Sequence, residues 1–180
     1  GIGGLTEEVH SAHAHGIGPA GAADWLSAEL ANLLVDNPRD AALLECTITG
    51  PRFVVHHDTW MAITGAPTTV RITAPGAAPM TLSTNADDAR VHALRAGTTV
   101  QIGAAQRGCR MYVAFPGGVA LPPVLGSRSA LRRAGIDGPA GRALVAGDTL
   151  PLAPGVHAPR ERRATVVAAA CAAAVAWLVR

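Results

Sequence analysis

Residues 45–73 read ECTITGPRFVVHHDTWMAITGAPTTVRIT, and this stretch decides the fold class. It holds four short runs rich in β-branched and aromatic residues, at 46–49, 52–56, 60–64 and 69–73. Glycine, proline or aspartate stands between the runs, and these residues favour tight turns. Short apolar runs bounded by turn residues are typical of strands in an antiparallel sheet.

The same pattern continues after this stretch. Further runs of this kind lie at 80–83, 90–94, 98–102 and 109–114, and residues 142–152 resemble one more hairpin arm. Turn signals recur roughly every 8–12 residues, which favours a β-sandwich or a β-barrel.

Before the strands, leucines at helical spacing predict one helix that begins after Asp24. Its predicted apolar stripe consists of Leu26, Leu30, Leu33 and Leu34. The dipeptide Asn37-Pro38 should end this helix. Shorter helical turns are predicted at 39–44 and 127–134. The fold class is therefore mainly β with a few helices.

The charged residues exclude several functions. The chain has 180 residues, and its 15 basic side chains against 13 acidic ones give a net charge of +2. No basic stripe stands out, so a nucleic-acid partner is not expected. All basic residues are Arg, which excludes Schiff-base lysine chemistry and a Walker-type lysine within this chain.

Cysteine and histidine spacing does not predict a metal site. Cys46, Cys109 and Cys171 form no CxxC pair, and we expect buried, reduced thiols in a cytoplasmic protein. The pair His13 and His15, like the adjacent pair at 56–57, lacks a third ligand at a suitable spacing. We therefore expect structural or solvated histidines and no bound metal.

The C-terminal region contains a run of 16 residues at 164–179 that is apolar except for Thr165, and half of these residues are Ala. A transmembrane helix needs about 20 apolar residues. We therefore expect a packed or surface-lying helix, with a membrane span as the less favoured alternative.

Several blocks of sequence resemble one family. The most specific are ANLLV, within ANLLVDNP at 31–38, and LGSRS, within PVLGSRS at 123–129. The others are 16–24, ALLE at 42–45, GP at 50–51, TGA at 64–66, GCRMYVA at 108–114, GG at 117–118, GRAL at 141–144 and GDTL at 147–150. Together the blocks extend from residue 16 to 152. They are similar to the group formed by the C subunits of 5-oxoprolinase, also called KipA-like or allophanate hydrolase subunit 2, a biotin-dependent carboxyltransferase family.

This resemblance implies a cyclophilin-like β-barrel. Chains of this family are nearly twice as long, so the barrel is expected to be incomplete here. Residues 1–152 would form the N-terminal half of the carboxyltransferase domain, and residues 153–180 an Ala-rich helical tail without likeness to the family.

The resemblance also implies a function. The chain would be one component of an ATP-dependent 5-oxoprolinase, which opens 5-oxoproline to glutamate, or of a related carboxyltransferase or allophanate hydrolase complex acting on a small amide or ureido metabolite. Its partners would be a KipI-like protein and a LamB/YcsF-like protein, the two other components of 5-oxoprolinase. ATP would act at the level of the complex, and biotin would be carried by a partner. The alternatives are a non-catalytic KipA-like protein that sequesters a KipI-type kinase inhibitor, and a truncated, inactive fragment.

Three residues are carried over from the family blocks as substrate-binding candidates, while the catalytic residues stay unknown. Asp24 closes the first block, and Ser127 and Arg128 lie in the Gly-Ser-Arg-Ser block. A guanidinium fits a carboxylate bidentately, and a carboxylate accepts hydrogen bonds from an amide. The other interpretation of Arg128 is a solvated basic face shared with Arg132 and Arg133.

Overall fold

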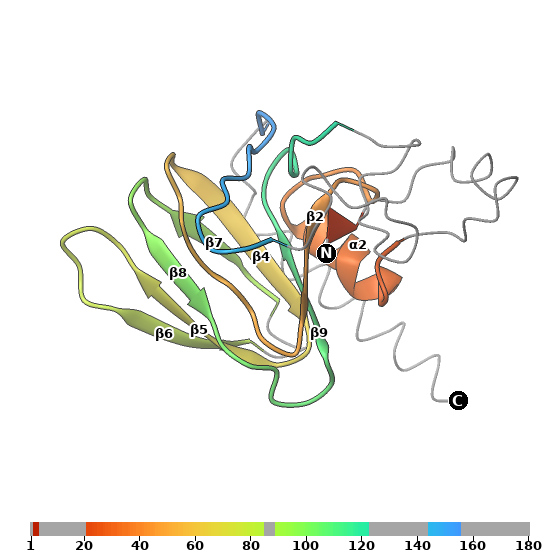
Figure 1. Ribbon diagram of the computed structural model, residues 1–180, viewed down its shortest axis with the longest axis horizontal. Coiled ribbons are helices and arrows are strands. Elements are labelled where there is room, and N and C mark those ends of the chain that lie inside the picture. The colour runs from red at the N-terminus through yellow and green to blue at the C-terminus, as the bar shows by residue number, and fades with distance from the viewer. Residues whose placement is uncertain (1, 4–20, 85–88, 123–143, 156–180) are drawn as a thin grey trace, which may run out of the picture.

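The computed structural model describes residues 2–3, 21–84, 89–122 and 144–155. In these residues the chain forms two antiparallel sheets and one helix, α2 (Trp25–Leu34) (Figure 1). The five-stranded sheet has the order β1 (Ile2–Gly3), β2 (Leu43–Thr47), β9 (Arg110–Ala114), β4 (Thr59–Gly65), β7 (Val91–Leu94). The four-stranded sheet has the order β3 (Arg52–Val54), β8 (Thr99–Ile102), β5 (Thr68–Thr73), β6 (Met80–Thr84).

The predicted fold class, mainly β with few helices, is confirmed. Each strand expected between residues 46 and 114 is present, with small shifts at the ends. In the described residues no strand pairing closes the two sheets into one barrel, which agrees with the expected incomplete form. The expected helical turn at 127–134 and the apolar run at 164–179 lie outside the described residues.

Two local predictions are wrong. The stretch expected as a helical turn at 39–44 ends in β2, because Leu44 pairs with Val113 of β9. The expected hairpin arm at 142–152 forms no strand in its described part, residues 144–152. A single bridge joins Leu152 to Val119 there, and Asp148 closes a turn by accepting a hydrogen bond from the Val145 N–H.

The main core lies between the two sheets. It includes Met61 and Ile63 of β4, Val70 of β5, Val100 of β8 and Met111 of β9. The chain passes from one sheet to the other after β2, at Gly50. A Cβ at this position would lie 2.2 Å from Cγ2 of Ile102, so the corner requires glycine.

A second core lies between α2 and the other face of the five-stranded sheet, the face that points away from β5, β6 and β8 (Figure 1). Small residues meet there: Ala28 and Ala31 of α2 pack with Ala62 and Ala114 of the sheet. The helix therefore buries a different stripe from the one predicted. Leu34 is buried as expected, whereas the other three predicted leucines are only partly buried, because alanines allow the helix to approach the sheet closely.

The central strands are consequently buried on both faces. Along β9, Met111 and Val113 belong to the core between the sheets, while Tyr112 and Ala114 belong to the core beneath α2. Strands covered on both faces appear in sequence as continuous apolar runs rather than alternating ones. This explains why the sequence MYVA at 111–114 contains no charge.

The C-terminal end of α2 is fixed by two buried asparagines. The Asn32 side-chain amide donates to the carbonyls of Arg39 and Ala41. The Asn37 side-chain amide donates to Oδ1 of Asn32 and to the backbone carbonyl of Phe115, and Asn37 Oδ1 accepts from the N–H of Gly117 at 2.7 Å. These hydrogen bonds tie the helix end to the segment that follows β9.

Two further expectations concern cysteines and membranes. Cys46 is buried as expected, whereas Cys109 is exposed, so the expectation of buried thiols is wrong for Cys109. Among the helices of the described residues, none has the length and apolar character needed to cross a bilayer.

Candidate functional site

A group of polar side chains lies on the face of the five-stranded sheet that α2 covers. In the register of β2 and β9, Glu45 is opposite Tyr112 and Thr47 is opposite Arg110. Side chains two residues apart on a strand point to the same face. These four side chains therefore share one face, and we call them the polar cluster.

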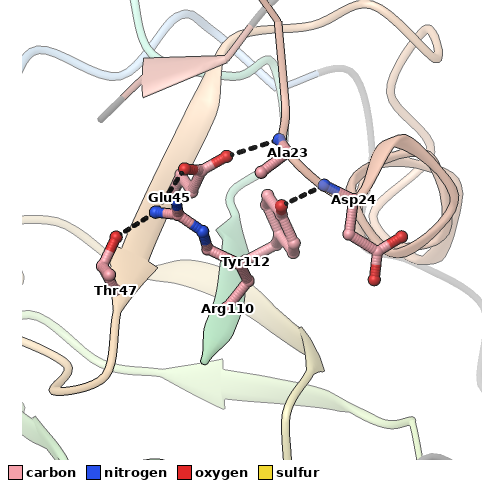
Figure 2. Close-up of polar contacts among 6 residues, drawn as sticks. All are labelled: Ala23, Asp24, Glu45, Thr47, Arg110 and Tyr112. Carbon is pink, nitrogen blue, oxygen red and sulfur yellow. Dashed lines mark hydrogen bonds and ion pairs between the residues drawn. The ribbon is translucent and has the colours of Figure 1, made fainter. Parts of the chain in front are cut away.

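The polar cluster is joined by short contacts to the start of α2 (Figure 2). The Glu45 carboxylate lies 3.0 Å from Nη1 of Arg110 and accepts from the backbone N–H of Ala23 at 2.9 Å. Nη1 of Arg110 also donates to the hydroxyl of Thr47. The segment before the helix is thereby fixed to the sheet by a charged pair.

Tyr112 is the fully buried member of the polar cluster. Its hydroxyl accepts from the backbone N–H of Asp24 at 2.7 Å. Burial raises the pKa of Tyr112 to about 12; the hydrogen bond from Asp24 opposes this shift, and the negative charge of Glu45 adds to it. The phenol is therefore held neutral at physiological pH.

The predicted site residue Asp24 serves as the N-cap of α2. Its carboxylate accepts from the Ser27 N–H at 3.1 Å and from the Ser27 hydroxyl at 2.6 Å. Figure 2 shows this carboxylate pointing away from the polar cluster. Only the backbone of Asp24 takes part in the cluster, and a role of its side chain in substrate binding stays a prediction. Ser127 and Arg128 lie outside the described residues.

The block at 64–66 supports the cluster from β4. The Thr64 hydroxyl donates to the carbonyl of Ser27 in the first turn of α2 at 2.6 Å. Gly65 has a φ of 92°, and a Cβ there would lie 2.5 Å from the carbonyl oxygen of Arg110. Glycine at this position lets β4 approach the backbone of Arg110, whose carbonyl accepts from the N–H of Ala66.

The polar cluster contains groups that are suited to hydrogen-bonding a ligand. Within the described residues, no three side chains of His, Cys, Asp or Glu come close enough together to hold a metal ion. His56 and His57 are exposed, and His13 and His15 lie outside the described residues. The groups in the cluster that are suited to a ligand are hydrogen-bond donors, above all the guanidinium of Arg110.

Reasoning from the sequence missed Glu45, Arg110 and Tyr112 as site residues. The available signal was an ionisable residue within an apolar strand, in LLECT and again in RMYVA. All three residues belong to blocks that carry the family resemblance. Blocks that are distant in sequence therefore meet at one place in the fold.

Comparisons with known proteins agree with this resemblance. The family described as "Carboxyltransferase domain, subdomain A and B" matches residues 15–180, a range that includes the Ala-rich segment after residue 152. The chain is 34% identical to the C subunit of 5-oxoprolinase from Escherichia coli over 148 residues, and 36% identical to urea amidolyase of Saccharomyces cerevisiae over 138 residues.

A solved structure gives the same likeness. The urea carboxylase of Kluyveromyces lactis matches with a TM-score of 0.64 and 27% sequence identity, over 79% of this chain and 13% of that chain. The matches to the two curated relatives span 79% and 75% of this chain, but only 43% of the 5-oxoprolinase polypeptide and 7% of urea amidolyase. The chain thus spans less than half the length of either relative.

Proposed function

The chain belongs to the family of carboxyltransferase domains, subdomains A and B, and we propose that it works as part of a complex of the 5-oxoprolinase or biotin-dependent carboxyltransferase type. Its substrate would be a small amide or ureido metabolite. The reaction would be either the ATP-dependent opening of 5-oxoproline to glutamate or the transfer of a carboxyl group to a ureido compound.

One observation carries the proposal. The family blocks at 16–24, 42–45, 64–66 and 108–114 contribute Asp24, Glu45, Thr64 and Arg110 to the same end of α2. A shared fold alone requires apolar residues at buried positions, whereas covering most of an ion pair costs desolvation of both charges. Its presence at a meeting point of distant blocks supports a ligand site there.

The described residues do not fit ATP. Carboxylates of Asp24 and Glu45 stand at the start of α2, and one guanidinium offsets them. The polar cluster therefore has no excess positive charge to balance the several negative charges of a triphosphate. We therefore assign ATP to the partner proteins and derive no step through it in this chain.

Biotin is proposed to reach the site on a partner. Once carboxylated, biotin carries a carboxylate, which fits the N–H donors of Arg110 in the polar cluster. When bound, carboxylated biotin would supply the carboxyl group to be transferred, and Arg110 would hold that carboxylate in place.

The partners and the domain boundary are part of the same proposal. A KipI-like protein would bind this chain, and a LamB/YcsF-like protein would complete a cytoplasmic complex. Residues 1–152 would form the N-terminal half of the domain, with residues 153–180 as a helical tail.

Reconstitution tests the proposal. The full chain is co-expressed with a KipI-like and a LamB/YcsF-like protein. Formation of glutamate from 5-oxoproline is measured with and without ATP, and formation of carboxylated urea is measured with added carboxylated biotin as the carboxyl donor. We expect a stable complex and turnover of one substrate that is lost when this chain is omitted. A complex without turnover would instead indicate the non-catalytic, inhibitor-sequestering function.

A further inference from the structure

The guanidinium of Arg110 uses one nitrogen for its contacts with the described residues. Nη1 faces the Glu45 carboxylate and donates to the Thr47 hydroxyl. Within residues 21–84, 89–122 and 144–155, no hydrogen bond or ion pair involves Nε or Nη2 of Arg110. These two nitrogens form the side of the guanidinium whose parallel N–H bonds match the two oxygens of a carboxylate.

This side of the guanidinium is held in place by its surroundings. The side chain of Glu45 is 14% exposed and that of Arg110 is 35% exposed, so the ion pair is largely covered while part of the guanidinium still reaches solvent. Gly65 packs against the backbone of Arg110. A donor that is fixed before its ligand arrives loses little entropy on binding.

A strained turn lies beside the cluster. Ile48 has a φ of 65°, which is rare for a β-branched residue, and its side chain is 61% exposed. Its N–H donates to the carbonyl of Cys109, the residue before Arg110. Strained residues persist where the surrounding structure fixes them, and they are concentrated at binding sites.

The charges near Arg110 are compatible with an anion. Glu45 and Arg110 neutralise each other, and the Asp24 carboxylate points away and is bound by Ser27 (Figure 2). The N-terminal end of α2 adds partial positive charge next to the cluster. Binding of an anion would therefore depend mainly on its two hydrogen bonds with the guanidinium, and less on an excess of positive charge around it.

We propose that Arg110 binds the carboxylate of a small substrate through Nε and Nη2, with Glu45 and Thr47 as positioning residues. This inference rests on the proposed function for the substrate class. It narrows that class to a lactam or amide that carries a carboxylate, as 5-oxoproline does, and disfavours neutral urea.

Nuclear magnetic resonance on the full chain tests the contact directly. The Nε–H signal of Arg110, assigned by its loss in Arg110→Lys, is followed while ligand is added. 5-Oxoproline should shift this signal. Its analogue without the carboxylate, 2-pyrrolidinone, and the neutral probes urea and biotin amide should leave it unmoved. An Arg110 signal that ignores 5-oxoproline, or that moves with a neutral probe instead, overturns the inference.

Variants supply the quantitative test. Arg110→Lys keeps a positive charge beside Glu45 but lacks the two parallel donors, and we expect 5-oxoproline to bind about tenfold more weakly. The control Arg71→Gln removes an exposed arginine on β5 and should leave the affinity unchanged. Equal affinity for Arg110→Lys and wild type, with both folded by circular dichroism, contradicts the inference.

The reconstituted complex separates this inference from the proposed function. Turnover of 5-oxoproline with a KM unaffected by Arg110→Lys would overturn the role of Arg110 and leave the function standing. Carboxylate binding at Arg110 in a chain that supports no turnover with its partners would keep the inference and overturn the function.

Discussion

The sheet face beneath α2 has two ends that differ in chemistry. At one end Leu34 of the helix packs with Leu43 and Ala114 of the sheet. At the other end, Glu45 pairs with Arg110; Glu45 lies two residues after Leu43 in β2, and Arg110 lies four residues before Ala114 in β9. The stability of the apolar end depends on how well the side-chain volumes fill the space. The stability of the ion pair depends on its geometry and on complete hydrogen bonding.

The difference indicates how the fold separates stability from recognition. The apolar end positions the helix, and the helix then places the Ala23 and Asp24 N–H groups against Glu45 and Tyr112. The side chains of the polar end can therefore keep a precise arrangement, because packing at the apolar end already fixes the position of the helix. Substitutions at the two ends should therefore differ in size and in kind.

The largest effect is expected at the apolar end. Leu34→Ala removes a side chain that is 2% exposed and should lower the free energy of unfolding by about 3 kcal/mol. Leu33→Ala is the matched control on the same helix, since Leu33 is only partly buried, and it should cost under about 1 kcal/mol. Urea denaturation measures both, and equal losses would contradict the assigned helix face.

A smaller effect is expected when the ion pair is broken. Glu45→Gln leaves Arg110 without its negative partner in a largely covered position and should cost about 2 kcal/mol. Glu29→Gln breaks the pair with Arg39, whose side chain is 69% exposed, and should cost under about 0.5 kcal/mol. Similar losses in the two variants would mean that burial does not strengthen the Glu45 pair.

The strands could be predicted from sequence because each is a short apolar run between turn residues. The start of β2 could not, since Leu44 becomes part of a strand by pairing with Val113 of β9, and Leu43 by pairing with Gly3 of β1. The buried stripe of α2 was misassigned for a similar reason. Leucine spacing suggested one face, but the sheet offers Ala62 and Ala114, against which alanines pack more closely.

The candidate site was harder to predict than the fold. The sequence predicted Asp24 at a helix start, which the structure confirms as the N-cap, whereas its substrate-binding role was taken from the family block and stays a prediction. Glu45 and Arg110 come together through the register of β2 and β9, which local sequence does not specify. Ser127 and Arg128 stay predictions.

The ionisation of Tyr112, followed in a pH titration, reports on the polar end. It is the only tyrosine in the chain, so tyrosinate absorbance reports on it alone. Because its pKa is raised from 10.0 to about 12 in the folded state, its contribution to stability is complete below pH 10 and is lost as the pH rises through about 12. In urea the absorbance change should return to a midpoint near pH 10.

Two variants serve as controls for this titration. Cys46, whose pKa burial raises from 9.0 to about 11, also lowers stability at alkaline pH, so wild type is compared with Tyr112→Phe, which keeps Cys46. Stability should fall less steeply in Tyr112→Phe between pH 10 and 12. In Glu45→Gln the tyrosine should ionise at lower pH than in wild type, because a negative neighbour is removed. An unchanged midpoint in that variant would show that Glu45 does not act on Tyr112.

The smallest expected effect concerns the strained turn at the polar end. Asparagine tolerates a positive φ far better than a β-branched residue does, and Ile48 buries little surface that its replacement would expose. Ile48→Asn should therefore raise the free energy of unfolding by about 1 kcal/mol.

Val54 is a matched control, since it is an exposed β-branched residue within strand β3. Val54→Asn should lower stability slightly, because asparagine is disfavoured in strands. If urea denaturation shows a loss in both variants, the backbone of Ile48 carries no strain, and the turn is then held by the Cys109 hydrogen bond without opposing cost.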